Sequence, residues 1–290
     1  MRLRSPLFAP GDSSHKSAKA IESDADAVIL DLEDSVAGPA KEAARHTIAQ
    51  IVRALGDRLR RHDIIVRVNP RGTPWYLGDL AAIVAAGPAA LMLPKCSGAD
   101  DLRALDHHLE ALETAAGLPV GGIKVIPIVT ETAGSVLALP TYKAAAPRVI
   151  AMAFGAEDFF ADLGLAPRRP DGTYHPAAIA ARTAVITAAA AIGVLALDTP
   201  WPDPRDPDGL RCEAEAAAAD GFAGKVLIHP AQIDIVNAAF TPKPEQVRWA
   251  ERVRDGFAAN PGSGVFSLDG KMIDRPHQKL AERILAAAER

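Results

Sequence analysis

Ionisable side chains follow several short apolar runs of the sequence, at points where a purely structural strand would stay apolar. Glu33 and Asp34 follow one run, Arg67 ends the next, and Glu131 and Asp158 follow two later runs. Carboxylates that lie close together repel one another unless a cation holds them. Oxygen ligands without a Cys or His cluster favour Mg²⁺ over Zn²⁺, and Mg²⁺ binds one or two carboxylates together with water and substrate oxygens. These residue types therefore predict a magnesium site.

A cation beside Arg67 is a plausible receptor for a substrate that carries carboxylate and carbonyl oxygens, and it would stabilise an enolate. Other chemistries have weaker support. Lys95 could form a Schiff base, but the surrounding acids would raise its pKa and make it a poor nucleophile. His229 is more readily explained as a structurally hydrogen-bonded side chain. The sequence contains no Gly-x-Ser-x-Gly elbow, so a serine hydrolase is not expected.

The elements that must position these side chains are eight apolar runs that alternate with Ala-rich helical segments such as residues 40–60. Such runs are typical of parallel strands buried on both faces. The alternation predicts an α/β fold, a (β/α)₈ TIM barrel, whose strands present active-site residues at their carboxyl ends. A doubly wound open sheet is the rival, but it would more usually show a glycine fingerprint than Pro10-Gly11-Asp12. The predicted strands are residues 6–9, 27–32, 64–68, 90–94, 125–129, 149–154, 195–198 and 225–228.

The alternating pattern ends near Pro230. Two helical segments follow, then a turn-rich break, a possible hairpin over residues 265–272 with Asp269-Gly270 as its turn, and a final amphipathic helix. We therefore expect a catalytic barrel over residues 1–235 and a C-terminal helical and hairpin extension over residues 236–290.

Composition excludes several classes of protein. Hydrophobic residues make up 49% of the chain and charged residues 23%, which is typical of a folded globular protein. A net charge of −4 and an aromatic content of 5% offer little to nucleic acid. We expect no membrane partner, because the basic N-terminus lacks a signal-peptide core and no apolar run is long enough to span a bilayer. Cys96 and Cys212 lie far apart and suggest reduced thiols in a cytoplasmic protein.

A series of motifs extends along the whole chain in a characteristic order. They are Pro10-Gly11-Asp12, Asp31-Leu32-Glu33-Asp34, Arg67-Val68-Asn69-Pro70, Pro94-Lys95, Glu131-Thr132-Ala133, Gly155-Ala156-Glu157-Asp158, Asp198-Thr199-Pro200, His229-Pro230 and Asp269-Gly270-Lys271-Met272-Ile273-Asp274. In these motifs the chain resembles the citrate lyase β-subunit-like group of the HpcH/HpaI aldolase and malyl-CoA/citramalyl-CoA lyase superfamily. The resemblance implies a TIM barrel, Mg²⁺, and the cleavage or formation of a C–C bond next to an acyl thioester.

The resemblance also implies roles for individual residues at the barrel mouth. Glu131 and Asp158 correspond to the two metal ligands of the family. Arg67 corresponds to the arginine that binds the keto acid and offsets developing charge. Glu33 and Asp34 correspond to acids that surround the water molecules on the metal.

Further roles concern the coenzyme and the C-terminal extension. Asp274 corresponds to a general acid/base that reaches in from a neighbouring subunit, which implies a homo-oligomer, a trimer or a hexamer. Lys19 corresponds to a basic residue near the CoA phosphates, and Phe8 and Pro10 lie near the pantetheine entrance. The chain departs from the family where Ser13-Ser14-His15 replaces Arg-Pro-Arg after Pro-Gly-Asp, and Lys16 is expected to compensate.

These expectations predict a Mg²⁺-dependent carbon–carbon lyase acting on a 3-hydroxy-dicarboxylyl-CoA such as citramalyl-CoA or malyl-CoA. Its products would be acetyl-CoA and a 2-keto acid, either pyruvate, glyoxylate or oxaloacetate. The alternatives are a citrate lyase β subunit acting on a citryl carrier protein, and a malate-synthase-like condensing enzyme or thioesterase. A metal-dependent aldolase for free 2-keto-3-deoxy acids and a non-catalytic organic-acid-binding barrel are further alternatives.

Overall fold

The computed structural model describes residues 1–56, 63–144, 147–166, 168–170 and 172–289. The chain divides into two compact units, Met1–Ala239 and Phe240–Arg290.

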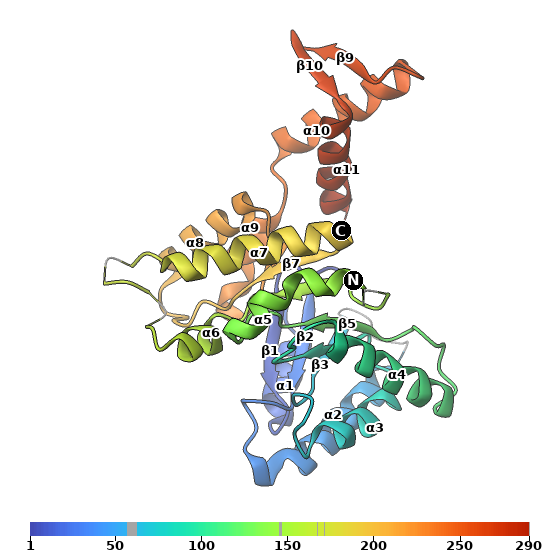
Figure 1. Ribbon diagram of the computed structural model, residues 1–290, viewed down its shortest axis with the longest axis vertical. Helices are drawn as coiled ribbons and strands as arrows, with labels where there is room; N and C mark the ends of the chain where they lie inside the picture. The colour runs from blue at the N-terminus through green and yellow to red at the C-terminus, as the bar shows by residue number, and fades with distance from the viewer. Residues whose placement is uncertain (57–62, 145–146, 167, 171, 290) are drawn as a thin grey trace. The chain divides into compact units, whose positions relative to one another are not determined.

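Parallel strands form the centre of the first unit, and their helices lie outside them (Figure 1). In the described residues the strands are β1 (Pro6–Pro10), β2 (Ala27–Asp31), β3 (Asp63–Arg67), β4 (Ala90–Leu93), β5 (Lys124–Pro127), β6 (Ala151–Ala153), β7 (Leu195–Asp198) and β8 (Gly224–Lys225). Their positions confirm the predicted runs, although β8 ends earlier than expected because Leu227 pairs with Leu7 only as an isolated bridge.

Backbone pairing arranges the strands in chain order. One sheet runs from β1 to β5 and the other from β6 to β8. The bridges Val125–Val149 and Ile128–Ala153 join β5 to β6. At the other seam the amide of Phe8 donates to the carbonyl of Leu227 at 2.8 Å. These contacts connect the edges of both sheets, and the predicted (β/α)₈ architecture is confirmed.

Helices connect the successive strands, as a parallel sheet requires. They are α1 (Ser14–Ile21), α2 (Lys41–Leu55), α3 (Tyr76–Val84), α4 (Ala99–Ala115), α5 (Ala133–Ala138), α6 (Ala156–Leu163), α7 (Pro176–Ile192), α8 (Pro207–Asp220) and α9 (Ile233–Phe240), with short 3₁₀ turns η1 (Gly38–Ala40), η3 (Leu139–Ala144) and η4 (Pro230–Gln232). The helix expected over residues 40–60 corresponds to α2, and its residues 57–60 lie outside the described part of the chain.

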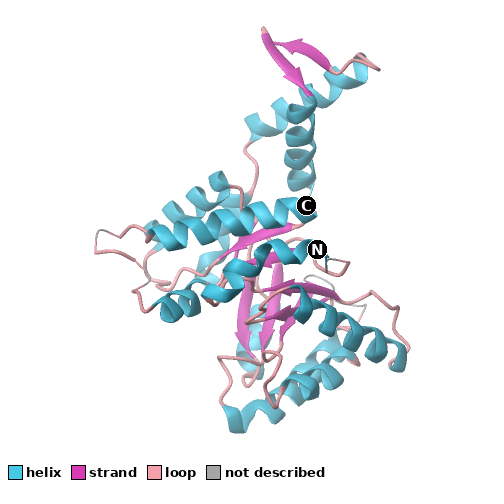
Figure 2. Ribbon diagram, viewed as in Figure 1, coloured by secondary structure: helices cyan, strands magenta, loops and turns pink. Residues whose placement is uncertain are grey.

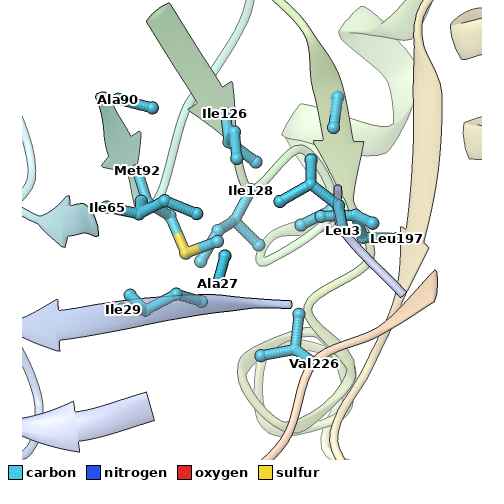
Figure 3. Packing of buried hydrophobic residues seen from close by; sticks show 12 residues of the cluster. Leu3, Ala27, Ile29, Ile65, Ala90, Met92, Ile126, Ile128, Leu197 and Val226 are labelled. Atoms are coloured by element: carbon cyan, nitrogen blue, oxygen red, sulfur yellow. The ribbon is translucent and has the colours of Figure 1, made fainter. Parts of the chain in front are cut away.

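The barrel interior is filled by alternate residues of the strands, because successive side chains of a strand point to opposite faces. Ile29, Ile65, Met92 and Ile126 meet there with side chains of the later strands (Figure 3). Asp31 follows Ile29 by two positions, and Arg67 follows Ile65 by two. The same alternation therefore directs Asp31 and Arg67 toward the interior at the carboxyl end of the barrel.

The second unit consists of two helices and a β-hairpin (Figure 2). Its elements are α10 (Pro244–Ala259), β9 (Val265–Leu268), β10 (Lys271–Asp274) and α11 (Arg275–Glu289). The strands are antiparallel, and the turn residues Asp269 and Gly270 have φ angles of 53° and 75°. Positive φ at both turn residues is typical of a type I′ turn, so the predicted hairpin is confirmed.

Candidate active site

Asp31 and Arg67 form a buried ion pair at the carboxyl ends of two neighbouring strands. They are direct partners in the parallel register of β2 and β3. The guanidinium donates to both carboxylate oxygens at 2.7 Å, and Asp31 is 1% exposed. Burial by itself would raise the pKa of Asp31, but the hydrogen bonds and charge of Arg67 outweigh it and lower that pKa. Asp31 therefore fixes Arg67 in a charged, bidentate geometry.

Two side chains, Asp31 and Lys41, hold the loop after β2 through hydrogen bonds with its backbone. The amides of Glu33 and Ser35 donate to the carboxylate of Asp31 at 2.9 and 3.0 Å. The ammonium of Lys41 donates to the carbonyls of Leu32 and Glu33 at 2.8 and 2.9 Å. These bonds set the direction in which the two acids of the loop leave the strand.

Glu33 and Asp34 extend from this loop toward two cations. Glu33 is buried and lies 3.0 Å from Arg67, and it accepts a hydrogen bond from the ammonium of Lys95. Asp34 is more exposed and lies 3.9 Å from Arg67 and 3.6 Å from Lys95. Burial raises the pKa of Glu33, while the charge of Arg67 opposes that change.

Glu131 and Asp158 approach Lys95 from the ends of later strands. Glu131 is 3% exposed and accepts a hydrogen bond from the main-chain amide of Lys95. Asp158, in the first turn of α6, lies 3.8 Å from the ammonium. Gly155 permits this close approach, because a Cβ there would lie 2.7 Å from Cγ of Glu131. The predicted convergence of acids from separate strand ends is therefore observed.

The charge of this cluster suits a divalent cation. Its described residues place five carboxylates, those of Asp31, Glu33, Asp34, Glu131 and Asp158, against the cations of Arg67 and Lys95. Burial raises the pKa of Glu131 to about 8, and the charges of its neighbours Glu33 and Asp158 act in the same direction. The buried Oε2 of Glu33 lacks a hydrogen-bond partner, because its ion pair with Arg67 lacks hydrogen-bond geometry.

The described residues of this cluster do not form a complete metal site from protein ligands alone. In the part of the chain that the structure describes, no three His, Cys, Asp or Glu side chains have the spacing of a metal site. Mg²⁺ usually takes only one or two carboxylates and completes its shell with water and substrate oxygens. Two acids such as Glu131 and Asp158 therefore fit Mg²⁺ better than Zn²⁺, which requires three or four protein ligands.

The residues expected near the coenzyme lie at the first strand and helix. The ring of Phe8, on β1, lies 4.5 Å from the guanidinium carbon of Arg67. Pro10 ends β1. Lys16 and Lys19 are exposed on α1. The structure thus brings Phe8 to the acidic cluster, and it leaves both lysine side chains accessible to a ligand.

Asp274 belongs to the second unit, where it ends β10. Its carboxylate lies 2.5 Å from Nδ1 of His277, three residues further along the chain. The role of Asp274 at the barrel mouth stays a prediction.

Sequence reasoning missed the residues that orient the predicted site. Asp31, Lys41 and Asn69 were not among the predicted site residues, although Asp31 holds Arg67 and the other two donate to the carbonyl of Leu32. The available signal was positional, because Asp31 and Arg67 end neighbouring apolar runs at equivalent places. His229 accepts a hydrogen bond from the amide of Ala231 at 3.2 Å and caps η4 with it.

Lys95 is not poised to act as a free amine. Burial alone would lower its pKa, but the carboxylates, with Glu33 foremost, raise it. An amine that stays protonated is a poor nucleophile, which argues against Schiff-base chemistry at this position.

Within the described residues, no helix is long and apolar enough to cross a membrane.

Comparisons with known proteins agree on one family. The family model described as HpcH/HpaI aldolase/citrate lyase matches residues 4–230. The citrate lyase subunit beta of Escherichia coli strain K12 is 35% identical over 289 residues, which cover 99% of this chain and 93% of that protein. A (3S)-malyl-CoA thioesterase of Cereibacter sphaeroides strain KD131 is 36% identical and covers 99% and 95%. Protein CitE of Mycobacterium tuberculosis, solved with magnesium, acetoacetate and coenzyme A, has a TM-score of 0.75 and 34% identity, and the match covers 100% of this chain and 99% of that one.

Proposed function

Because the chain belongs to the HpcH/HpaI aldolase/citrate lyase family, we propose that it is a Mg²⁺-dependent carbon–carbon lyase. Its substrate is a 3-hydroxy-dicarboxylyl-CoA such as citramalyl-CoA or malyl-CoA. Cleavage yields acetyl-CoA and a 2-keto acid, pyruvate or glyoxylate, and the same site runs the reverse condensation. The observation that carries this proposal is the cluster of acids from several strand ends around Arg67 and Lys95.

Glu131 and Asp158 hold Mg²⁺ in this proposal. When bound, Mg²⁺ supplies Lewis-acid stabilisation of negative charge on the substrate oxygens. The bound cation would also offset the repulsion between Glu131 and its acidic neighbours. That repulsion is one of the causes of the raised pKa of Glu131.

Arg67 binds the carboxylate of the keto-acid part of the substrate and offsets the charge that develops as the C–C bond breaks. Its guanidinium is pre-oriented by Asp31, so little conformational entropy remains to be lost when substrate binds. Glu33 and Asp34 also hold Arg67 and Lys95 in place.

Two proton transfers complete the reaction. The substrate hydroxyl must lose a proton for the C–C bond to break, and the resulting thioester enolate must gain one at carbon. Asp274 is the proposed acid/base group, supplied by a neighbouring subunit of a trimer or hexamer. Size-exclusion chromatography that finds an active monomer would contradict supply from a neighbour.

The coenzyme part of the substrate is proposed to enter beside the first strand. Phe8 and Pro10 flank the pantetheine arm, and Lys16 and Lys19 bind the CoA phosphates as exposed cations. The protein is proposed to work in the cytoplasm, where acyl-CoA thioesters are available.

A substrate panel tests the proposal. Citramalyl-CoA, malyl-CoA, a citryl carrier protein and a free 2-keto-3-deoxy acid are each incubated with the purified protein, and products are identified by mass spectrometry. We expect acetyl-CoA and a 2-keto acid from a CoA substrate, with loss of turnover in Glu131→Ala. Cleavage of the citryl carrier protein alone would favour a citrate lyase β subunit, and binding without turnover would favour a non-catalytic barrel.

A thioesterase is the second candidate, because one relative is a (3S)-malyl-CoA thioesterase. The same panel separates the two reactions. Hydrolysis of malyl-CoA releases malate and free CoA, whereas C–C cleavage releases glyoxylate and acetyl-CoA.

A further inference from the structure

Lys95 adopts a backbone conformation that side chains rarely tolerate. Its φ angle is 50°, and within the described residues it shares a positive φ with only one other non-glycine residue, Asp269 of the hairpin turn. The left-handed conformation is unfavourable for a residue with a Cβ, because the Cβ comes too close to the following carbonyl oxygen. Both residues lie in turns: Asp269 closes the hairpin, and Lys95 lies in the turn that follows β4. Such a conformation persists only where the surrounding contacts hold it, and it is common at functional sites.

The main chain of Lys95 supplies one reason for the conformation. Its amide donates to Oε2 of Glu131 across the end of the neighbouring strand β5. The turn after β4 thus presents this N–H to a buried carboxylate.

The side chain of Lys95 contacts the remaining acids. Its ammonium donates to Glu33, and it lies 3.6 Å from Asp34 and 3.8 Å from Asp158. One residue therefore touches both acids of the loop after β2 and both proposed metal ligands, one through its amide and the other through its charge.

We propose that Lys95 sets the affinity of this acidic cluster for its divalent cation, because its amide positions Glu131 while its ammonium shares Asp158 with the metal. This inference rests on the proposed metal site. Lys95 is a positioning residue in it and forms no bond to substrate. Its two parts have opposite effects: the amide favours metal binding, and the positive charge opposes it.

The charge effect has a predictable size. A unit charge about 5 Å from a divalent cation changes the affinity of that cation roughly tenfold, even with water-like screening. Removal of the ammonium should therefore tighten metal binding by about that factor.

Mn²⁺ binding to the chelator-treated full-length protein, measured by isothermal titration calorimetry, tests the inference without reference to turnover. Lys95→Met removes the charge and keeps most of the side-chain length, and Lys95→Arg is the matched control that keeps the charge. We expect Lys95→Met to bind Mn²⁺ roughly tenfold more tightly than the wild type, and Lys95→Arg to bind within about threefold of it. Unchanged or weaker binding in Lys95→Met would overturn the inference.

Lys95→Gly separates the backbone from the charge and protects the test against a folding failure. Glycine adopts positive φ without strain, so this variant keeps the amide directed at Glu131 while it lacks the ammonium. We expect it to bind Mn²⁺ at least as tightly as Lys95→Met, and binding no tighter than that of the wild type contradicts the inference. If the wild type itself fails to bind Mn²⁺, the metal-dependent function falls as well. A metal-binding wild type with unchanged variants removes only the role of Lys95.

Discussion

The substitution Asp31→Asn tests whether the ion pair under the acidic cluster supports the barrel as well as the site. The wild-type carboxylate receives two bonds from Arg67 and two from backbone amides. Asparagine keeps the shape of the side chain but removes its charge. Its NH₂ group also faces an N–H donor, with which it cannot form a hydrogen bond. Breaking a buried pair by removing one partner costs about 3–5 kcal/mol. Because Arg67 retains Glu33 at 3.0 Å, we expect the lower end, about 3 kcal/mol.

Equilibrium unfolding in urea, followed by far-UV circular dichroism, measures this loss. Thermal unfolding gives a second measure: for a unit the size of Met1–Ala239, about 3 kcal/mol corresponds to a fall of roughly 6 °C in Tm. Asp100→Asn is the matched control, since Asp100 pairs with Arg103 on an exposed face of α4. An exposed pair of this kind contributes about 0–1 kcal/mol. A loss in Asp31→Asn no larger than that of the control would refute the reasoning.

The pH dependence gives the same prediction a second readout. The pKa of Asp31 is lower in the folded protein than its ordinary value of 3.8. Its ionised form therefore stabilises the fold fully above about pH 4, and this contribution is lost as the pH falls through the lowered pKa. The difference in unfolding free energy between wild type and Asp31→Asn should be constant near neutral pH and should shrink below pH 4. A difference that grows on acidification contradicts the assignment.

Three further substitutions test separate parts of the account. Gly155→Ala brings a Cβ within 2.7 Å of Cγ of Glu131 and should weaken Mn²⁺ binding about tenfold or more in calorimetry, a loss of roughly 1.4 kcal/mol. Gly134→Ala is the control, because a Cβ there meets nothing closer than 3.8 Å. Equal Mn²⁺ binding by the two variants would argue against Glu131 as a ligand. Lys225→Met leaves two buried acids without their shared cation and should cost about 3–5 kcal/mol in urea unfolding, whereas a neutral effect would show that the network is dispensable. Asp274→Asn should lower kcat about 10²–10⁴-fold in a lyase assay with little change in unfolding, and unchanged kcat would remove it from the reaction.

The barrel was predictable from the sequence because its signal is local and repeated. Apolar runs buried on both faces mark parallel strands. For example, β7 spans Leu195–Asp198, the same residues as the predicted run. The hairpin was equally visible, because Asp269-Gly270 suits a type I′ turn. The length of β8 was not predictable from the sequence, because its pairing with β1 depends on how the barrel closes.

The candidate site was predictable in its acids but not in the contacts among them. Asp198 also ends a strand, yet its carboxylate lies 2.8 Å from the buried Lys225 and pairs with Arg182 of α7. Side-chain alternation explains the difference, because Leu197 faces the barrel interior and its neighbour faces the helices. The contacts of Lys95 with Glu33 and Glu131 could not be predicted from the sequence, because only the fold brings these residues together.

The central claim is that the acids at the barrel mouth bind Mg²⁺ for cleavage of a C–C bond next to a CoA thioester. The most direct measurement is the rate at which purified protein forms 2-keto acid from malyl-CoA and citramalyl-CoA, first in EDTA and then after Mg²⁺ is added back in excess. We expect no keto acid in EDTA, and restored formation with equimolar acetyl-CoA once Mg²⁺ is present. Full activity in EDTA would contradict it.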